Sequence, residues 1–199
     1  QIATHYGLRT INVLTGFKFI GEQIGKLEKQ GRAESYVFGF EESYGYLTGS
    51  YVRDKDGVDG AYMICEMFSY YAAKGISLLD KLDELYEAYG YCLNTLHSYE
   101  FDGSAGFAKM QSIMQAFRGD IKEFGGKKAV QLLDYAPGLD GLPKSDVLKF
   151  LLEDNCSIVV RPSGTEPKLK TYISVSAENK ETAEIVEADI RKSAEKYLK

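Results

Sequence analysis

The sequence contains no tryptophan, two histidines and three cysteines among its 199 residues. Two histidines offer few candidates for a zinc site or a Ser–His–Asp catalytic triad, because both usually depend on histidine. The cysteines, Cys65, Cys92 and Cys156, form no Cys-x-x-Cys pair, and each lies in an apolar stretch. We therefore expect buried, reduced thiols in a cytoplasmic protein.

Membrane and nucleic-acid partners are also disfavoured. No apolar run reaches the ~18–20 residues of a membrane-spanning helix, and residues 1–5 lack the basic and apolar regions of a signal peptide. The net charge is −5 and the pI about 5.2, whereas nucleic-acid surfaces are usually basic. Any bound anion must therefore be held by a local cationic cluster. The chain starts without methionine, and we interpret it as a piece of a longer protein.

The first half of the chain reads as an α/β unit. Alternating β-branched residues predict a strand over 9–14. A turn then leads into a short helix predicted around 20–29, and a short apolar run predicts a second strand over 35–40. Helical spacing of apolar residues predicts helices over 61–74 and 78–89, each followed by a glycine. The second helix is predicted to bury a stripe formed by residues 78, 79, 82, 85, 86 and 89. The order strand–helix–strand favours a mostly parallel sheet.

The pattern changes near residue 91, where strands begin to dominate. They are predicted over 91–101, 129–135, 147–152, 156–161 and 169–175. Helices are predicted over 104–117, with residues 107, 110, 113, 114 and 117 on one face, and over 181–198; residues 153–155 are predicted to form a hairpin turn. This half therefore reads as an antiparallel α+β domain, and we place the domains at 1–93 and 94–199.

Residues 161–170, Arg-Pro-Ser-Gly-Thr-Glu-Pro-Lys-Leu-Lys, form the most informative segment. A strand delivers Arg161, Ser163, Gly164 and Thr165 into a tight turn. An arginine fork and two hydroxyls suit a phosphate dianion, and a glycine lets backbone N–H groups approach its oxygens. A plain hairpin turn is the alternative, because Pro, Ser, Gly and Thr are all common turn residues.

This segment resembles the domain 4 phosphate loop of the α-D-phosphohexomutases, the phosphoglucomutase/phosphomannomutase family. The resemblance implies that Arg161, Ser163, Gly164 and Thr165 grip the phosphate of the substrate. Lys170, rather than Lys168, matches the later basic position of the family loop.

A second unusual segment follows the strand predicted over 35–40. It places adjacent carboxylates, Glu41 and Glu42, in an aromatic frame. Carboxylates and hydroxyls at the end of a strand can hydrogen-bond to vicinal sugar hydroxyls, and Tyr44 and Tyr46 supply flat apolar walls. A helix N-terminus, which favours acidic residues, is the alternative.

The segment is similar to the sugar-specificity loop of the same family, whose Glu and Ser contact the hexose 3- and 4-hydroxyls; these fall on Glu41 and Ser43. Residues 53–57 resemble the family's RxKDG segment, which implies that Lys55 meets the substrate. The turn starting with Thr15 and ending with Lys18 resembles one that lines the sugar site.

The resemblance covers essentially the whole chain. It implies most of domain 3, a partial three-layer α/β domain over 1–93, followed by domain 4, a smaller antiparallel-sheet phosphate-binding α+β domain over 94–199. Domains 1 and 2 of the same polypeptide are absent and are its expected partners. The aromatic residue and glycine after Ser43 resemble the glucomutase branch, which favours glucose over glucosamine.

The family's reaction moves a phosphoryl group between the C1 and C6 oxygens of a hexose through a bisphosphorylated intermediate. It uses a phosphoserine in a Ser-His-Asn-type loop and Mg²⁺ in a DGDxD-type loop, and neither string occurs here. Residues 54–59 also fail the EF-hand template. We therefore expect no catalytic residue and no metal site in this chain, and Mg²⁺ only in a full-length parent.

The expected function is that of the substrate-orienting half of a phosphoglucomutase, which binds a phosphohexose and is inactive alone. A free-standing sugar-phosphate-binding module is the alternative from another class. Phosphomannomutase, phosphopentomutase and glucose-1,6-bisphosphate synthase are alternatives from the same superfamily.

Overall fold

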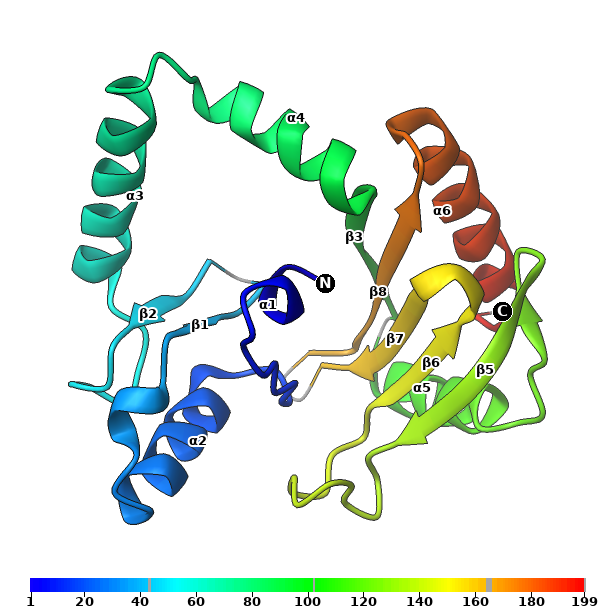
Figure 1. The fold of residues 1–199 in the computed structure, drawn as a ribbon. Helices are drawn as coiled ribbons and strands as arrows, with labels where there is room; N and C mark the ends of the chain where they lie inside the picture. Colours follow the sequence, from blue (N-terminus) through cyan, green and yellow to red (C-terminus); the bar gives the residue numbers. More distant parts are fainter. Residues whose placement is uncertain (43, 102, 164–165, 199) are drawn as a thin grey trace. The chain divides into compact units, whose positions relative to one another are not determined.

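The computed structural model describes residues 1–42, 44–101, 103–163 and 166–198, and the chain divides into two compact units, residues 1–84 and 85–199. Figure 1 shows the elements of both units along the chain. Within the described residues, every helix is too short or too polar to cross a membrane.

The first unit is built of short helices and a small sheet. Its elements are α1 (Ile2–His5), α2 (Phe17–Lys29), the 3₁₀ turn η1 (Ala33–Ser35), β1 (Phe38–Phe40), β2 (Tyr46–Thr48), α3 (Gly57–Ala72) and α4 (Leu78–Tyr89), which continues into the second unit. The i, i+3 and i+7 side chains Phe17, Ile20 and Ile24 of α2 pack with Leu47 of β2 as a small core. The core thus anchors β2 on α2.

The sheet of this unit differs from the prediction of mostly parallel strands. β1 and β2 pair antiparallel, with Gly39 opposite Leu47. The strand predicted over 9–14 is wrong, since these residues have no regular structure. Alternation makes a segment suitable for a sheet, but a strand also needs a backbone partner, and residues 9–14 pair with none within the described chain.

The two long helices of the unit form as predicted, but the stripe that was predicted to be buried on α4 is not buried. Gly75 and Gly90 follow them with positive φ of 71° and 84°, and Ser77 and Asp80 cap α4 reciprocally over 3.0 Å. In contrast, Leu79 and Leu82 of the predicted stripe are 73% and 40% exposed, and Ile64 and Phe68 of α3 are 54% and 59% exposed. Helical spacing marks a face that can be buried, but burial needs a covering element, and none buries these faces within the described residues.

The second unit is an antiparallel sheet with helices, as predicted. Its strands are β3 (Tyr91–Glu100), β4 (Glu123–Phe124), β5 (Lys127–Asp134), β6 (Leu148–Leu152), β7 (Ser157–Pro162) and β8 (Lys168–Ala177), in the order β3-β8-β7-β6-β5-β4. Its helices are α5 (Gly103–Phe117) and α6 (Lys180–Ala194), with the 3₁₀ turns η2 (Glu153–Asn155) and η3 (Glu195–Tyr197). Figure 1 shows the sheet curling, with α6 alongside β8. The fold class predicted from the sequence is therefore confirmed.

The core of the second unit is large and partly aromatic. Phe117, Phe124 and Phe150 are at most 1% exposed, and their ring centroids lie 5.0–6.4 Å apart. The expected apolar face of α5 is buried except for Phe107, which is 48% exposed.

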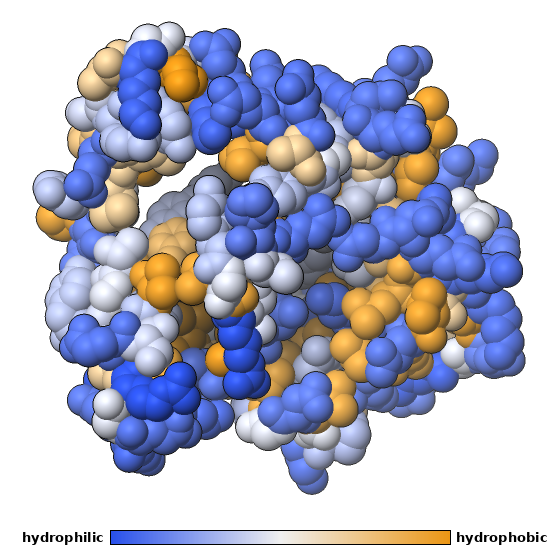
Figure 2. All heavy atoms as spheres, in the orientation of Figure 1, coloured by the Kyte–Doolittle hydropathy of each residue, from blue (hydrophilic) through white to orange (hydrophobic). Residues whose placement is uncertain are grey.

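The prediction of buried thiols holds for one cysteine of three. Cys156 is buried, whereas Cys65 and Cys92 are exposed, and none forms a disulfide. Cys65 lies on the uncovered helix α3, and Cys92 lies on the exposed side of the alternating strand β3. On the face shown in Figure 2, apolar groups interrupt a mostly hydrophilic surface.

An arginine joins the ends of the long connection between β5 and β6. Arg118 donates from Nε to Asp134 Oδ2 over 2.8 Å and from its NH2 group to Asp146 Oδ1 over 2.7 Å. Asp134 ends β5 and Asp146 precedes β6. The hydrogen bond from Arg118 holds the pKa of Asp134 below its usual value, despite partial burial.

This bridge predicts an acid-sensitive contribution to stability. A carboxylate with a lowered pKa in the folded state stabilises it above the pKa of the unfolded chain, and that contribution is lost as the pH falls. We expect Asp134→Asn to lower the free energy of unfolding at pH 7 by about 1 kcal/mol and to have a smaller effect at pH 3. Urea denaturation at both pH values, followed by amide NMR signals of the second unit, measures this.

The control is Asp140→Asn, which changes an exposed carboxylate in the same connection. An equal loss at both pH values for Asp134→Asn would contradict a role for its charge.

Candidate functional site

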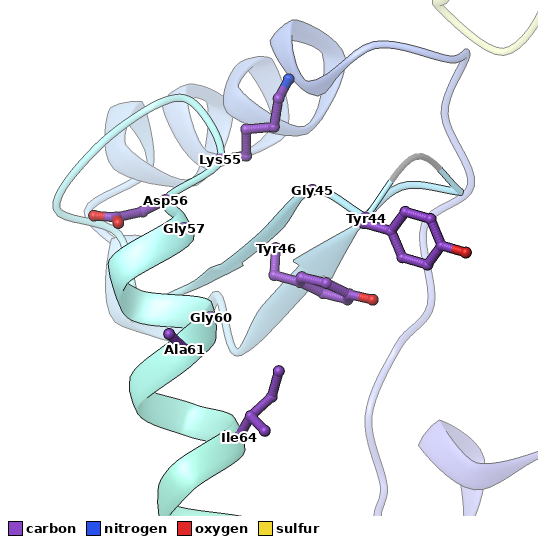
Figure 3. Close-up of a pocket in the computed structure, with 9 residues that line it drawn as sticks. All are labelled: Tyr44, Gly45, Tyr46, Lys55, Asp56, Gly57, Gly60, Ala61 and Ile64. Carbon is purple, nitrogen blue, oxygen red and sulfur yellow. The ribbon is translucent and has the colours of Figure 1, made fainter.

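A pocket in the first unit lies between the loop after β1 and the start of α3. Its volume is about 300 Å³, at the lower end for ligand pockets. It is lined by Tyr44, Gly45, Tyr46, Lys55, Asp56, Gly57, Gly60, Ala61 and Ile64. Figure 3 shows Tyr46 on one side and Ala61 and Ile64 of the helix on the other. One wall is therefore loop and strand, and the other is helix.

A partly buried ion pair stands at this pocket. Lys55 Nζ lies 3.3 Å from Glu41 Oε1, and the Glu41 side chain is 8% exposed whereas that of Lys55 is 51% exposed. Gly45 makes this approach possible, because a Cβ there would lie 2.6 Å from Glu41 Oε1 and 2.8 Å from Lys55 Cδ. The structure thus brings together Glu41 and Lys55, which come from separate segments and which the resemblance assigned to substrate binding.

The other predicted sugar-site residues are placed differently. Thr15 is exposed, and Lys18 lies on α2 with its Nζ 5.0 Å from the centroid of the Phe19 ring. Neither residue lines the pocket. Ser43 lies outside the described residues.

Asp56 is a structural member of this site that the functional prediction missed. Its Oδ1 accepts from the backbone N–H of Val58 and Asp59 over 2.8 and 3.1 Å, capping α3. Its Oδ2 accepts from Tyr51 Oη over 2.8 Å. These bonds, led by the one from Asp59, lower the pKa of Asp56, and the bond to Asp56 raises the pKa of Tyr51 to about 12. An Asp before Gly-Val-Asp is an N-cap signal that marks this helix start.

The second candidate site is the hairpin between β7 and β8. Pro162 pairs with Leu169, and Ser163 N donates to Lys168 O over 2.7 Å, which closes the turn. Ser163 Oγ accepts from Glu166 N over 3.3 Å. Gly164 and Thr165 lie outside the described residues.

Two cations stand directly opposite each other at the base of this hairpin. Arg161 pairs with Lys170 in the ladder, and the next pair, Val160 and Thr171, is fully buried. Side chains alternate along strands, so the two cations share the face away from the core. Like charges in opposite positions are unfavourable. Within the described residues, no carboxylate forms an ion pair with either cation, so an anion would relieve their repulsion.

Lys168 differs from Lys170 in this respect. Its Nζ lies 3.1 Å from Glu100 and 3.4 Å from Glu166, and the bond to Glu100 raises the pKa of Lys168. Lys168 is therefore already neutralised by protein carboxylates. The register singles out Lys170 as the partner of Arg161.

The described residues contain no group of three or more His, Cys, Asp or Glu side chains placed to hold a metal ion. We therefore assign no metal ligand here.

The fold and the two loops define a chain with an α/β unit carrying a polar pocket and an antiparallel α+β unit carrying a cationic hairpin. Residues 1–89 match the family model "Phosphoglucomutase/phosphomannomutase, alpha/beta/alpha domain III", and residues 105–192 match "Phosphoglucomutase/phosphomannomutase, C-terminal domain". The chain belongs to the phosphoglucomutase/phosphomannomutase family, of which it carries domains III and IV.

Similar proteins bear the same family name. A phosphoglucomutase of Staphylococcus aureus (strain MSSA476) is 37% identical over 191 residues, and one of Staphylococcus epidermidis (strain RP62A) is 33% identical over 191 residues. Both alignments cover 90% of this chain but 34% of the relative, so the chain spans about a third of their length. The open form of pp63/parafusin, a phosphoglucomutase from Paramecium, shares the fold, with a TM-score of 0.72 and 22% identity over 99% of this chain and 35% of its own.

Tyr44, at the rim of the pocket, has an unusual backbone conformation. Its φ is +63° and its side chain is 84% exposed, so the ring contributes little packing. A left-handed conformation costs a side chain roughly 1–2 kcal/mol, and glycine avoids that cost but loses more entropy on folding. We expect Tyr44→Gly to be more stable than Tyr44→Ala by about 0.5–1 kcal/mol, measured by thermal or urea denaturation.

The matched pair Tyr62→Gly and Tyr62→Ala changes an exposed tyrosine within α3 and should show the opposite order, because glycine weakens a helix interior. If Tyr44→Ala were the more stable of its pair, the left-handed conformation would be refuted.

Proposed function

We propose that this chain binds a phosphohexose, with the 161–170 hairpin holding the phosphate and the 41–57 segment reading the sugar. The opposed cations Arg161 and Lys170 carry the proposal, because a dianion offsets their repulsion and accepts hydrogen bonds from both. Ser163, Gly164 and Thr165 complete the phosphate loop through hydroxyl and backbone donors.

The hexose hydroxyls are bound by a hydrogen-bond acceptor and a hydrogen-bond donor of the first unit. Glu41 accepts from hexose hydroxyls and Lys55 donates to them, and their 3.3 Å ion pair holds both ready at the pocket. The family resemblance adds a further hydroxyl from Ser43 and assigns Thr15 and Lys18 to the sugar site, although neither of these two lines the pocket. A free sugar carries no charge and would leave the repulsion between Arg161 and Lys170 in place. This favours a phosphosugar over a sugar without phosphate as the ligand.

In a full-length parent we propose the role of a substrate-orienting half. The chain holds the phosphate that is not reacting, while domains I and II of the same polypeptide carry out phosphoryl transfer between glucose 1-phosphate and glucose 6-phosphate. Mg²⁺ in that parent would offset charge on the moving group. The described residues of this chain offer it no ligand cluster, so no step is assigned to it here. Two exposed free thiols support a reducing compartment such as the cytoplasm.

The phosphate site can be tested directly. Titration with inorganic phosphate, followed by amide NMR, should shift signals within 161–170 first, and Arg161→Ala should weaken that binding at least about ten-fold because it removes a charge-assisted fork.

Arg32→Ala is the matched control, since it removes the same charge from an exposed position in the other unit. Shifts scattered over the chain, or a similar loss in both variants, would show that the phosphate responds to net charge and not to the hairpin.

The chain alone should have no mutase activity. Phosphoryl transfer needs a nucleophile to carry the group and a cation to offset its charge, and the sequence has neither a Ser-His-Asn nor a DGDxD string. A coupled assay from glucose 1-phosphate to glucose 6-phosphate, with Mg²⁺ and glucose 1,6-bisphosphate, should read background while a full-length phosphoglucomutase turns over. Turnover that copurifies with the chain would refute the assigned role.

A further inference from the structure

The two walls of the pocket in the first unit are connected by one side chain. Thr48 ends β2, two residues after the pocket residue Tyr46, and Asp59 lies in the first turn of α3 beside the pocket residue Gly60. Asp59 Oδ2 accepts from Thr48 N over 2.7 Å, and Asp59 Oδ1 accepts from Thr48 Oγ1 over 2.6 Å. One carboxylate therefore uses both oxygens to hold the strand end. Such charge-assisted bonds are stronger than neutral ones.

Neighbouring contacts show that strand and helix are closely fitted at this point. Asp56 N donates to Tyr46 O over 2.9 Å. A Cβ built on Gly60 would lie 3.6 Å from the Tyr46 side chain, at ordinary van der Waals distance. On the other side of β2, Tyr36 Oη donates to Leu47 O over 3.1 Å. The strand is therefore held from both sides, and the Thr48–Asp59 pair provides two of the bonds to the helix.

Apolar burial cannot supply the same constraint. Within α3 only Gly60 is buried among the described residues, so the helix has few apolar contacts to fix its distance from β2. The separation of the pocket walls depends on polar contacts at the first turn of the helix instead.

We propose that Thr48 and Asp59 are positioning residues for hexose recognition: their paired hydrogen bonds hold the loop wall and the helix wall at the separation that the sugar needs. The inference rests on the proposed function of the pocket. A ligand that binds only when the two walls stand at this separation has an apparent affinity proportional to the fraction of molecules in which they do. Weakening the pair should therefore weaken sugar binding without removing any group that touches the sugar.

The test is a conservative series at Thr48 in the chain of 199 residues. Thr48→Val keeps the shape and removes the hydroxyl donor, whereas Thr48→Ser keeps the hydroxyl. Affinities for glucose 1-phosphate and for inorganic phosphate are measured in parallel by NMR titration. We expect Thr48→Val to weaken glucose 1-phosphate about five- to ten-fold, equivalent to about 1.0–1.4 kcal/mol, with phosphate unchanged and Thr48→Ser within about two-fold of wild type.

Thr95→Val is the matched control. Thr95 Oγ1 donates to Glu187 Oε1 over 2.7 Å in the second unit, so the substitution breaks the same kind of bond away from the pocket. It should leave the affinity for glucose 1-phosphate unchanged. An equal loss in Thr95→Val and Thr48→Val would assign the effect to general destabilisation and overturn the proposal.

Asp59→Asn provides an independent variant if Thr48→Val does not fold, because it keeps the size of the side chain and one acceptor oxygen. It should also weaken glucose 1-phosphate selectively, and the double variant should bind no more weakly than the worse single variant, since both act on one pair. Additive losses, or wild-type affinity in both single variants, would overturn the positioning role. A different result would refute the sugar-binding function itself, and the positioning role with it: equal affinities of the wild-type chain for glucose 1-phosphate and for inorganic phosphate.

Discussion

The antiparallel pairing of β7 with β8 is the constraint on which the phosphate-binding account depends. Leu169 and Ile173 of β8 are fully buried, as are Ile158 and Val160 of β7, and this alternation fixes which side chains face the core. A register slip of one residue would exchange the two faces of a strand. The opposition of Arg161 and Lys170 outside the core is therefore maintained by apolar burial on the other face, and it requires no contribution from the net charge of the chain.

The two units hold their loops by different means. The second unit has a large core in which rings of α5, β4 and β6 meet, so its hairpin projects from a rigid sheet. Among the described residues, the core cluster of the first unit consists of four buried apolar side chains, and α3 lies largely exposed. Its pocket is consequently shaped by polar contacts: the Glu41–Lys55 ion pair, the Asp56 cap and the Thr48–Asp59 bonds. For this reason, substitution of one of these polar residues should disturb the shape of the pocket, because few apolar contacts hold it in place.

Local signals in the sequence predicted much of this structure. The capping pair Ser77–Asp80, the glycines that end α3 and α4, and the turn at 153–155 each depend on a few adjacent residues, and all three are confirmed. The predictions of a strand over 9–14 and of a buried stripe on α4 were wrong, because both need a partner element that periodicity cannot identify. The bond between Thr48 and Asp59 and the neutralisation of Lys168 by Glu100 join residues distant in the sequence, and no local pattern marks them.

The central proposal is that the hairpin of the second unit binds phosphate and that the pocket loop of the first unit binds sugar hydroxyls. The most direct measurement is a crystal structure of the chain grown with glucose 1-phosphate. The account predicts that the phosphate contacts the Arg161 guanidinium and the Ser163 hydroxyl, with sugar hydroxyls within hydrogen-bonding distance of Glu41 or Lys55. A phosphate bound outside residues 161–170, or a sugar with no contact to residues 41–57, would contradict it.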